Sequence, residues 1–192
     1  MNFYFSAVLL GLGFASLAMG IFISMRIFNI PDITTDGSFT LGGAITAVMI
    51  SGGYSPWTSL LFVFTAGAIA GISTGLIHTK LKVNALLAGI LVMTALYSVN
   101  LAIMGRSNIP LLDTSSVFDL TNSFMTNANS QLLILLIFTS ILWALLSWLL
   151  KTDFGLAMRA TGNNEQMIRS LGVNPQTLKI AGIGLANGLI AV

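Results

Sequence analysis

The sequence predicts an all-α fold, a polytopic bundle of transmembrane helices. Hydrophobic residues make up 55% of its 192 residues and charged residues only 7%, whereas a soluble domain carries about 25% charged residues. The mean hydropathy is correspondingly high, at +0.91. The apolar residues are gathered into runs separated by polar, turn-forming stretches. Several runs reach the length of about 20 residues that a membrane-crossing helix needs.

We expect about six spans, the last one incomplete, within a single transmembrane domain that covers residues 1–192. The predicted spans are approximately 3–25, 38–51, 57–78, 83–105, 131–150 and 180–192. The first run is interpreted as a retained span, because no basic residues precede it as they would in a signal peptide. Since the last run is too short to cross a bilayer, we expect the chain to be truncated at its C-terminus.

The second predicted span is short and follows a helix-breaking stretch. Pro31 and the turn pair Asp36-Gly37 precede the apolar run 38–51. Such a run is compatible with a tilted span, a re-entrant segment or one half of a discontinuous helix. Asp32 and Asp36 form either a carboxylate pair or, in the favoured interpretation, turn and cap residues.

Small and polar residues distinguish the third and fourth spans. Gly67, Gly71 and Gly75 recur at four-residue spacing, which places them on one helix face where a neighbouring backbone can approach closely. The fourth span carries polar residues, among them Asn84 and Asn100. Because unpaired polar groups are costly in lipid, these residues either form hydrogen bonds between helices or line a polar pathway.

The segment 151–179 lies between the last two runs and is predicted to fold as two short helices. The first would cover 155–161 and end at Gly162, since glycine tolerates the left-handed conformation of a helix C-terminus. Asn163 would cap the second helix, with Gln166 three residues later as a variant of the capping box.

The end of this segment carries further helix signals. Gly172 would end the second helix, and Asn174-Pro175 would supply a cap and a first-turn proline for the last apolar run. Arg159 and Arg169 are predicted to point into water. Spacing alone leaves two interpretations open: a small folded element exposed to water, or an amphipathic segment resting on anionic lipid head groups.

The basic residues predict the orientation. None of the eight Lys and Arg residues falls inside a predicted span, where each would cost about 2.5–3.5 kcal/mol at the centre. Alternating crossings leave Arg106 alone on one side of the membrane and place the other seven on the opposite side: Arg26, Lys80, Lys82, Lys151, Arg159, Arg169 and Lys179. The positive-inside rule makes that second side cytoplasmic. We therefore expect the N-terminus outside the cell.

Catalytic chemistry finds little support in the sequence. There is no cysteine, and His78 is the single histidine, which excludes a disulfide framework and a two-histidine metal site. No phosphate-binding loop of the Gly-x-x-x-x-Gly-Lys-Ser/Thr type occurs. We expect no catalytic residue, no metal and no cofactor, and the net charge of +2 gives no indication of nucleic-acid binding. The chain is therefore not predicted to be an enzyme.

One set of motifs resembles a known family. Gly155, the pattern Arg159-Ala160-x-Gly162-x-Asn164 and then Gly172-Val173 resemble the cytoplasmic coupling loop of permease subunits of ABC importers. That family includes branched-chain amino acid and ribose permeases. Members often have Ala-Ala where this chain has Met167-Ile168. These two residues, together with the segments 31–39 and 104–111, are similar to the pattern of a subgroup described as tryptophan or tyrosine permeases.

The resemblance implies a function and a set of partners. The loop would dock into an ATP-binding subunit through seven residues: Gly155, Arg159, Ala160, Gly162, Asn164, Arg169 and Gly172. A second permease subunit, in a homodimer, would complete the path through the plasma membrane of a prokaryote. An extracytoplasmic binding protein would deliver a small solute, with an amino-acid-like one favoured, and ATP would be used by the partner subunit.

Three polar residues are the candidates for a translocation path: Asp36, Asn84 and Asn100. The alternative function is a self-contained channel or secondary transporter. Such a protein should carry intramembrane charge for ion coupling, and the predicted spans contain none. A membrane-embedded enzyme would need paired catalytic groups at one depth. Neither alternative accounts for a capped, basic, two-helix segment at the cytoplasmic side.

Overall fold

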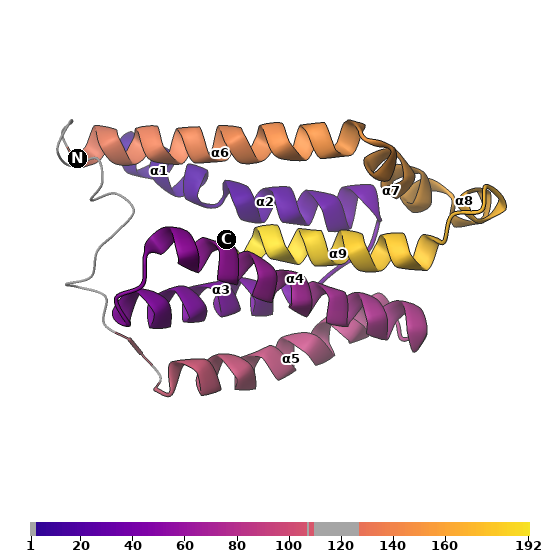
Figure 1. Cartoon of the computed structure of the whole chain (residues 1–192), viewed down its shortest axis with the longest axis horizontal. Helices are drawn as coiled ribbons and strands as arrows, with labels where there is room; N and C mark the ends of the chain where they lie inside the picture. Colours follow the sequence, from indigo (N-terminus) through magenta and orange to yellow (C-terminus); the bar gives the residue numbers. More distant parts are fainter. Residues whose placement is uncertain (1–2, 107, 110–126) are drawn as a thin grey trace.

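A computed structural model describes residues 3–106, 108–109 and 127–192, with only the backbone described for 127–130. Helices run side by side along the long axis of an elongated bundle (Figure 1). The described residues contain helices and no strand. Their bounds are α1 Phe3–Gly13, α2 Ala15–Ile21, the π-helix η1 Phe22–Ile27, α3 Thr34–Ser51, α4 Pro56–Lys80, α5 Ala85–Met104, α6 Asn127–Lys151, α7 Asp153–Asn163, α8 Glu165–Ser170 and α9 Pro175–Ala191.

Among the described residues, three helices are long and apolar enough to cross a membrane: α4, α5 and the part of α6 from Gln131 to Lys151. The pair formed by α1 and by residues 15–27 passes the same test as one unit, with a bend of 43°. The predicted all-α membrane fold is therefore confirmed. The predicted spans 38–51 and 180–192 lie in α3 and α9, which do not belong to this set.

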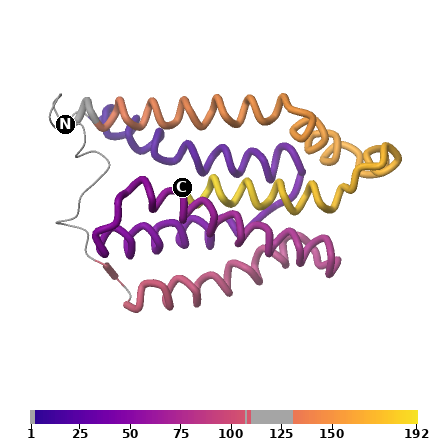
Figure 2. The backbone as a smooth tube through the Cα atoms, viewed as in Figure 1, coloured from indigo at the N-terminus to yellow at the C-terminus, as the bar shows by residue number. Residues whose placement is uncertain are grey.

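The chain is not helical where it turns back after η1. Residues 29–33 have no regular secondary structure, and the chain runs back along the bundle before α3 begins midway along it (Figure 2). A Cβ atom added to Gly37 would lie 3.1 Å from the Cα atom of Met93, in the middle of α5. α3 is itself one continuous helix, and the break lies before it, at residues 29–33.

An extensive close contact joins α4 to α9 through the small residues predicted to form a packing face. Side chains at Gly67, Gly71 and Gly75 would meet the α9 backbone, at the carbonyl oxygens of Asn187 and Ile183 and at the Cα atom of Ile180. The helices therefore approach more closely than any side chain larger than hydrogen would allow. Lipid provides no hydrophobic drive between helices, so such close contact is the main source of their association.

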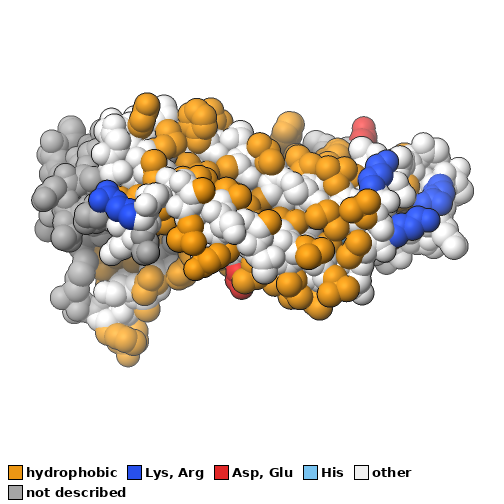
Figure 3. Space-filling view, turned by 90° about the horizontal axis from the view of Figure 1, so that it is seen from below, with side chains coloured by type: hydrophobic (Ala, Val, Ile, Leu, Met, Phe, Trp, Pro, Cys, Tyr) orange, Lys and Arg blue, Asp and Glu red, His pale blue; other side chains and the backbone are white. Residues whose placement is uncertain are grey.

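The bundle ends differ in charge. Lys and Arg side chains lie at both ends of the face seen in Figure 3, and hydrophobic side chains are spread over the face between them. The end at which η1, α4 and α6 finish and the α7–α8 region projects is called the basic end below. It carries seven basic residues: Arg26, Lys80, Lys82, Lys151, Arg159, Arg169 and Lys179.

The α4–α9 contact can be tested with two alanine substitutions. Gly71→Ala places a methyl group against the Ile183 carbonyl, and we expect it to destabilise the protein by about 1–3 kcal/mol through overpacking. Gly43→Ala on α3 is the control, because a Cβ there meets nothing within 4 Å. The melting temperature in detergent should fall for the first variant and stay level or rise for the second. Equal melting temperatures would contradict the close packing.

Candidate functional site

The 151–179 segment forms two short helices with well-defined caps. Thr152 Oγ1 accepts a hydrogen bond from the Gly155 amide at the start of α7, at 3.4 Å. Asn164 Oδ1 accepts from the amides of Gln166 and Met167, at 3.0 and 3.1 Å, and so begins α8. Each cap satisfies amides that a helix start would leave unpaired. The caps therefore satisfy the N-terminal ends of both short helices.

Some of the predicted details of this segment were wrong. Gly162 does not end a helix but lies within α7, which continues to Asn163, and the cap of the second helix is Asn164. The reason for a glycine at 162 is tertiary, because any Cβ there would collide with the carbonyl oxygen of Ile27 at the end of η1. Spacing along one segment could not reveal that contact.

Other details are confirmed. Gly172 follows α8 with φ +83°, a left-handed conformation that suits glycine. Asn174 caps α9 by accepting from the Gln176 amide at 3.0 Å, and Pro175 is the first residue of that helix.

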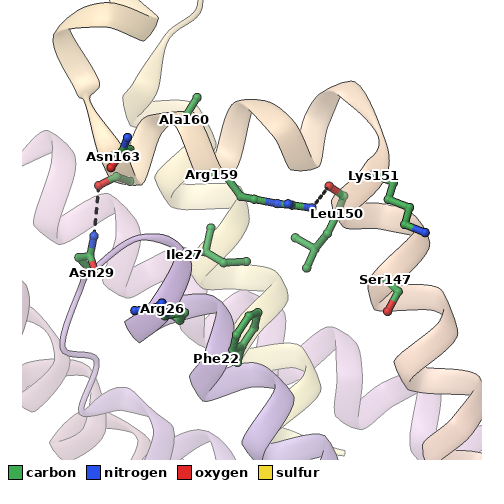
Figure 4. A pocket seen from close by; sticks show the side chains of 11 residues that line it. Phe22, Arg26, Ile27, Asn29, Ser147, Leu150, Lys151, Arg159, Ala160 and Asn163 are labelled. Atoms are coloured by element: carbon green, nitrogen blue, oxygen red, sulfur yellow. Dashed lines mark hydrogen bonds between the residues drawn. The ribbon is translucent and has the colours of Figure 1, made fainter.

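Buried side chains fix the segment to the bundle. Met158 of α7 is fully buried and Ile168 of α8 is 4% exposed, and both belong to one core cluster with Phe28 and Leu178. Asn29 Nδ2 also donates to the Gly162 carbonyl at 3.3 Å (Figure 4). α7 therefore contacts the end of η1 directly, and a displacement of the segment would act on the bundle.

The two arginines of this segment have different surroundings. Arg169 on α8 is exposed. Arg159 is exposed too, yet its guanidinium extends from α7 to α6, where it donates to the Leu150 carbonyl (Figure 4). Arg159 is therefore exposed as predicted, and its guanidinium also contacts the backbone of α6.

The remaining predicted residues of the segment divide into packing and lining positions. Gly155 is buried, and a side chain there would meet the backbone of Leu149 and Leu150. Ala160 is half-buried and borders a cavity. Beyond them, the tip of α8 exposes Met167 and Leu171, at 57% and 66%. An exposed apolar tip beside a basic residue is a surface that suits a protein partner.

A buried polar network lies at the centre of the bundle. Asn187 of α9 accepts from Ser38 Oγ at 2.7 Å, and its amide nitrogen donates to Asp32 Oδ2, also at 2.7 Å. Asp32 Oδ1 in turn accepts from the Thr34 amide at 2.9 Å, and the Thr34 hydroxyl lies 2.7 Å from that of Thr74 on α4. These bonds join the broken stretch, α3, α4 and α9 at one depth.

Sequence reasoning missed this network. Asp32 and Asp36 do not form a carboxylate pair, because Asp32 is buried in the network and Asp36 is exposed. Asp32 lies in the stretch 29–33 without regular secondary structure, and Asp36 lies in the first turn of α3. A usable signal was Asn187, a polar residue within a run of Gly, Ala and Leu.

Two of the three predicted path residues are linked through Thr40, and Asp36 takes part by its backbone carbonyl. Asn100 of α5 donates through Nδ2 to Thr40 Oγ1 at 3.0 Å, and that hydroxyl donates to the backbone carbonyl of Asp36 at 3.0 Å. The Oδ1 atom of Asn100 is buried and has no hydrogen-bond partner among the described residues. These residues form the α3–α5 polar face, defined as Asp36, Thr40 and Asn100.

Asn84 lies elsewhere. It precedes α5 and caps that helix by accepting from the Leu86 amide at 2.9 Å. Sixteen residues separate it from Asn100, which at a rise of 1.5 Å per residue corresponds to about 24 Å. Asn84 therefore forms neither a bond between helices nor a part of the α3–α5 polar face. The described residues also contain no group of three side chains suited to holding a metal ion.

Comparison with known proteins identifies the family. The model of the family described as branched-chain amino acid transport system / permease component matches residues 3–191. The chain belongs to this family. The resemblance found in the sequence is thereby confirmed at the level of the family, whose description is that of a transport permease component.

Curated relatives agree with this assignment. A tyrosine transport system permease protein of Clostridioides difficile is 42% identical over 176 residues, which cover 92% of this chain and 57% of the relative. An uncharacterized protein of Rickettsia prowazekii is 35% identical over 195 residues, covering all of this chain and 66% of the relative. The autoinducer 2 import system permease protein of Salmonella typhimurium is 28% identical over 177 residues, 92% of this chain and 49% of the relative.

The chain thus spans about half to two thirds of the length of the curated relatives it matches. No solved structure gives a significant match.

The two neighbouring aspartates offer a direct test of the polar network. Asp32→Ala leaves the amide of Asn187 without its carboxylate partner, and we expect a loss of about 1–3 kcal/mol in stability, because a buried donor is left unsatisfied. Asp36→Ala is the control, since that side chain is exposed. Thermal unfolding in detergent should separate the two variants by several degrees. An Asp36→Ala protein as unstable as Asp32→Ala would show that the network is not the cause.

Proposed function

We propose that this chain is the membrane-spanning permease subunit of an ATP-driven importer in the plasma membrane of a prokaryote. It would translocate a small solute that an extracytoplasmic binding protein delivers. Family membership and the 42% identical tyrosine permease favour an amino-acid-like solute. Relatives named for autoinducer 2 and galactofuranose are less similar, at 28% and 26% identity.

The observation that carries this proposal is the rigid attachment of α7 and α8 to the bundle. Met158 and Ile168 are buried in the core, while the tip of α8 remains exposed. In the proposed mechanism an ATP-binding subunit binds this tip by contacting Arg169 and the apolar residues beside it. Closure of that subunit moves α7, whose Gly162 touches the end of η1. The core cluster shared with α9 passes the displacement on to the transmembrane helices.

The α3–α5 polar face is the proposed solute path. Asp36 is exposed although α3 begins midway along the bundle, and acidic atoms lie among hydrophobic side chains partway along the face seen in Figure 3. An ionised carboxylate facing lipid is costly, so such a residue faces a polar path or a partner. A second permease subunit opposite this face, forming a homodimer, would enclose the path.

The alternative, a channel or secondary transporter that works without an ATP-binding subunit, is favoured by one observation. Asp32 and Asp36 are ionisable groups at the start of α3, midway along the bundle, and ionisable groups within the membrane are a feature of ion-coupled transporters. Asp32, however, is engaged by Asn187 and by the Thr34 amide, which gives it a structural role. Capture of a partner by α8 distinguishes the two functions.

Photocrosslinking tests the docking role. These 192 residues contain no cysteine, so Arg169→Cys gives them a single thiol for a photoreactive maleimide, in membranes that contain the whole transporter with any other cysteine replaced. We expect capture of the ATP-binding subunit, because Arg169 lies at the exposed α8 tip. Lys82→Cys, exposed at the same end of the bundle, is the control and should capture at least about tenfold less. Free labelling at Arg169 without any adduct would favour the channel or secondary transporter.

Solute uptake tests the path. Asp36→Asn removes the charge from the α3–α5 polar face while keeping the shape of the side chain, and we expect transport to fall about tenfold or more with crosslinking at α8 unchanged. Thr65→Val on α4 is the control, because that exposed hydroxyl donates only to its own helix, at the Phe62 carbonyl. Normal uptake by Asp36→Asn would remove this face from the path.

A further inference from the structure

A cavity opens at the basic end between η1 and α6. Its volume is about 810 Å³, within the range of about 300–1,000 Å³ that small-molecule sites occupy. η1, α6 and α7 all contribute to its wall (Figure 4). It is separate from the polar network around Asn187 and from the α3–α5 polar face, because none of their residues borders it.

The charge of this cavity is one-sided. Three basic residues border it, Arg26 from η1, Lys151 from the last turn of α6 and Arg159 from α7, and no Asp or Glu residue does. Within the part of the chain that the structure describes, none of the three forms an ion pair. Arg159 is partly satisfied by the Leu150 carbonyl, while positive charge around the space remains uncompensated. Such a site attracts an anion.

The rest of the wall indicates which kind of anion. Neutral hydrogen-bonding groups are present on Asn29, Asn163 and Ser147, and apolar groups on Phe22, Ile27 and Leu150. The cavity also adjoins α6, whose outer surface is apolar and exposed, with Ile141 54% and Leu145 57% exposed. A polar, cationic recess at the end of an apolar helix face matches a molecule with an anionic head and hydrocarbon chains.

We propose that this cavity binds the phosphate head group of an anionic phospholipid from the leaflet at the basic end. The phosphate would lie among Arg26, Lys151 and Arg159, with the acyl chains along α6. Basic recesses between transmembrane helices are typical lipid head-group sites. By linking η1, α6 and α7, the bound lipid would brace the base of the 151–179 segment. The proposal requires a membrane protein with its basic end at the lipid surface and does not depend on the transported solute.

The test is lipid-dependent thermal stability of the purified, delipidated protein in neutral detergent. Phosphatidylglycerol should raise the melting temperature by several degrees, whereas phosphatidylcholine, whose phosphate is neutralised by choline, and inorganic phosphate should not. The double variant Arg26→Gln with Lys151→Gln should lose most of this shift. The matched control is Lys80→Gln with Lys82→Gln, which removes the same charge at the same end outside the cavity, and it should keep the shift.

Each other outcome overturns the proposal. An equal shift in both double variants would indicate general attraction of anionic lipid to a basic surface. A shift produced by inorganic phosphate would indicate a free-anion site. If phosphatidylglycerol has no effect on the wild type but the cavity variant fails to capture the ATP-binding subunit in the crosslinking assay, the positive charge serves a protein partner. As a control for folding, the melting temperature of the cavity variant without lipid should equal that of the wild type.

Discussion

The structure depends on one buried amide, that of Asn187. Its oxygen accepts from Ser38 on α3, and its nitrogen donates to Asp32 in the broken stretch before that helix. Inside a membrane every polar group must find its partner within the protein. A chain that interrupts its helix at membrane depth therefore needs side chains that replace the missing backbone bonds. Asp32 does so for the amide of Thr34, and Asn187 holds Asp32 in place.

The close contact of α4 with α9 makes this arrangement possible. Because Gly67 and Gly71 lack side chains, the α9 backbone approaches α4 closely at Ile183 and Asn187. The same approach brings Asn187 within reach of α3. A larger residue on that face of α4 would separate the helices and stretch the short hydrogen bonds of the network. The hydrogen bonds of Asn187 thus depend on the close packing of α4 against α9.

The other end of α9 belongs to the 151–179 segment. Leu178 lies in the core cluster that also contains Met158 and Ile168, and Lys179 forms an ion pair with Glu165 at the start of α8. α9 therefore connects the projecting segment to the buried amide of Asn187 through one continuous helix. The same helix thus contacts both the projecting segment and the stretch at which the chain is broken before α3.

The sequence by itself determined the membrane class, the approximate positions of the helices and the local caps. These depend on composition and on short-range hydrogen bonds, as at Gly172, Asn174 and Pro175, and a linear pattern records both. The family motif in 155–173 was likewise a property of the sequence. Only the tertiary structure decided why Gly162 is a glycine, where Arg159 points and that Asp32 is buried against Asn187. Those features arise from contacts between different segments of the chain, Gly162 with Ile27, Arg159 with Leu150 and Asp32 with Asn187. Spacing within one helix carries no information about which segments meet.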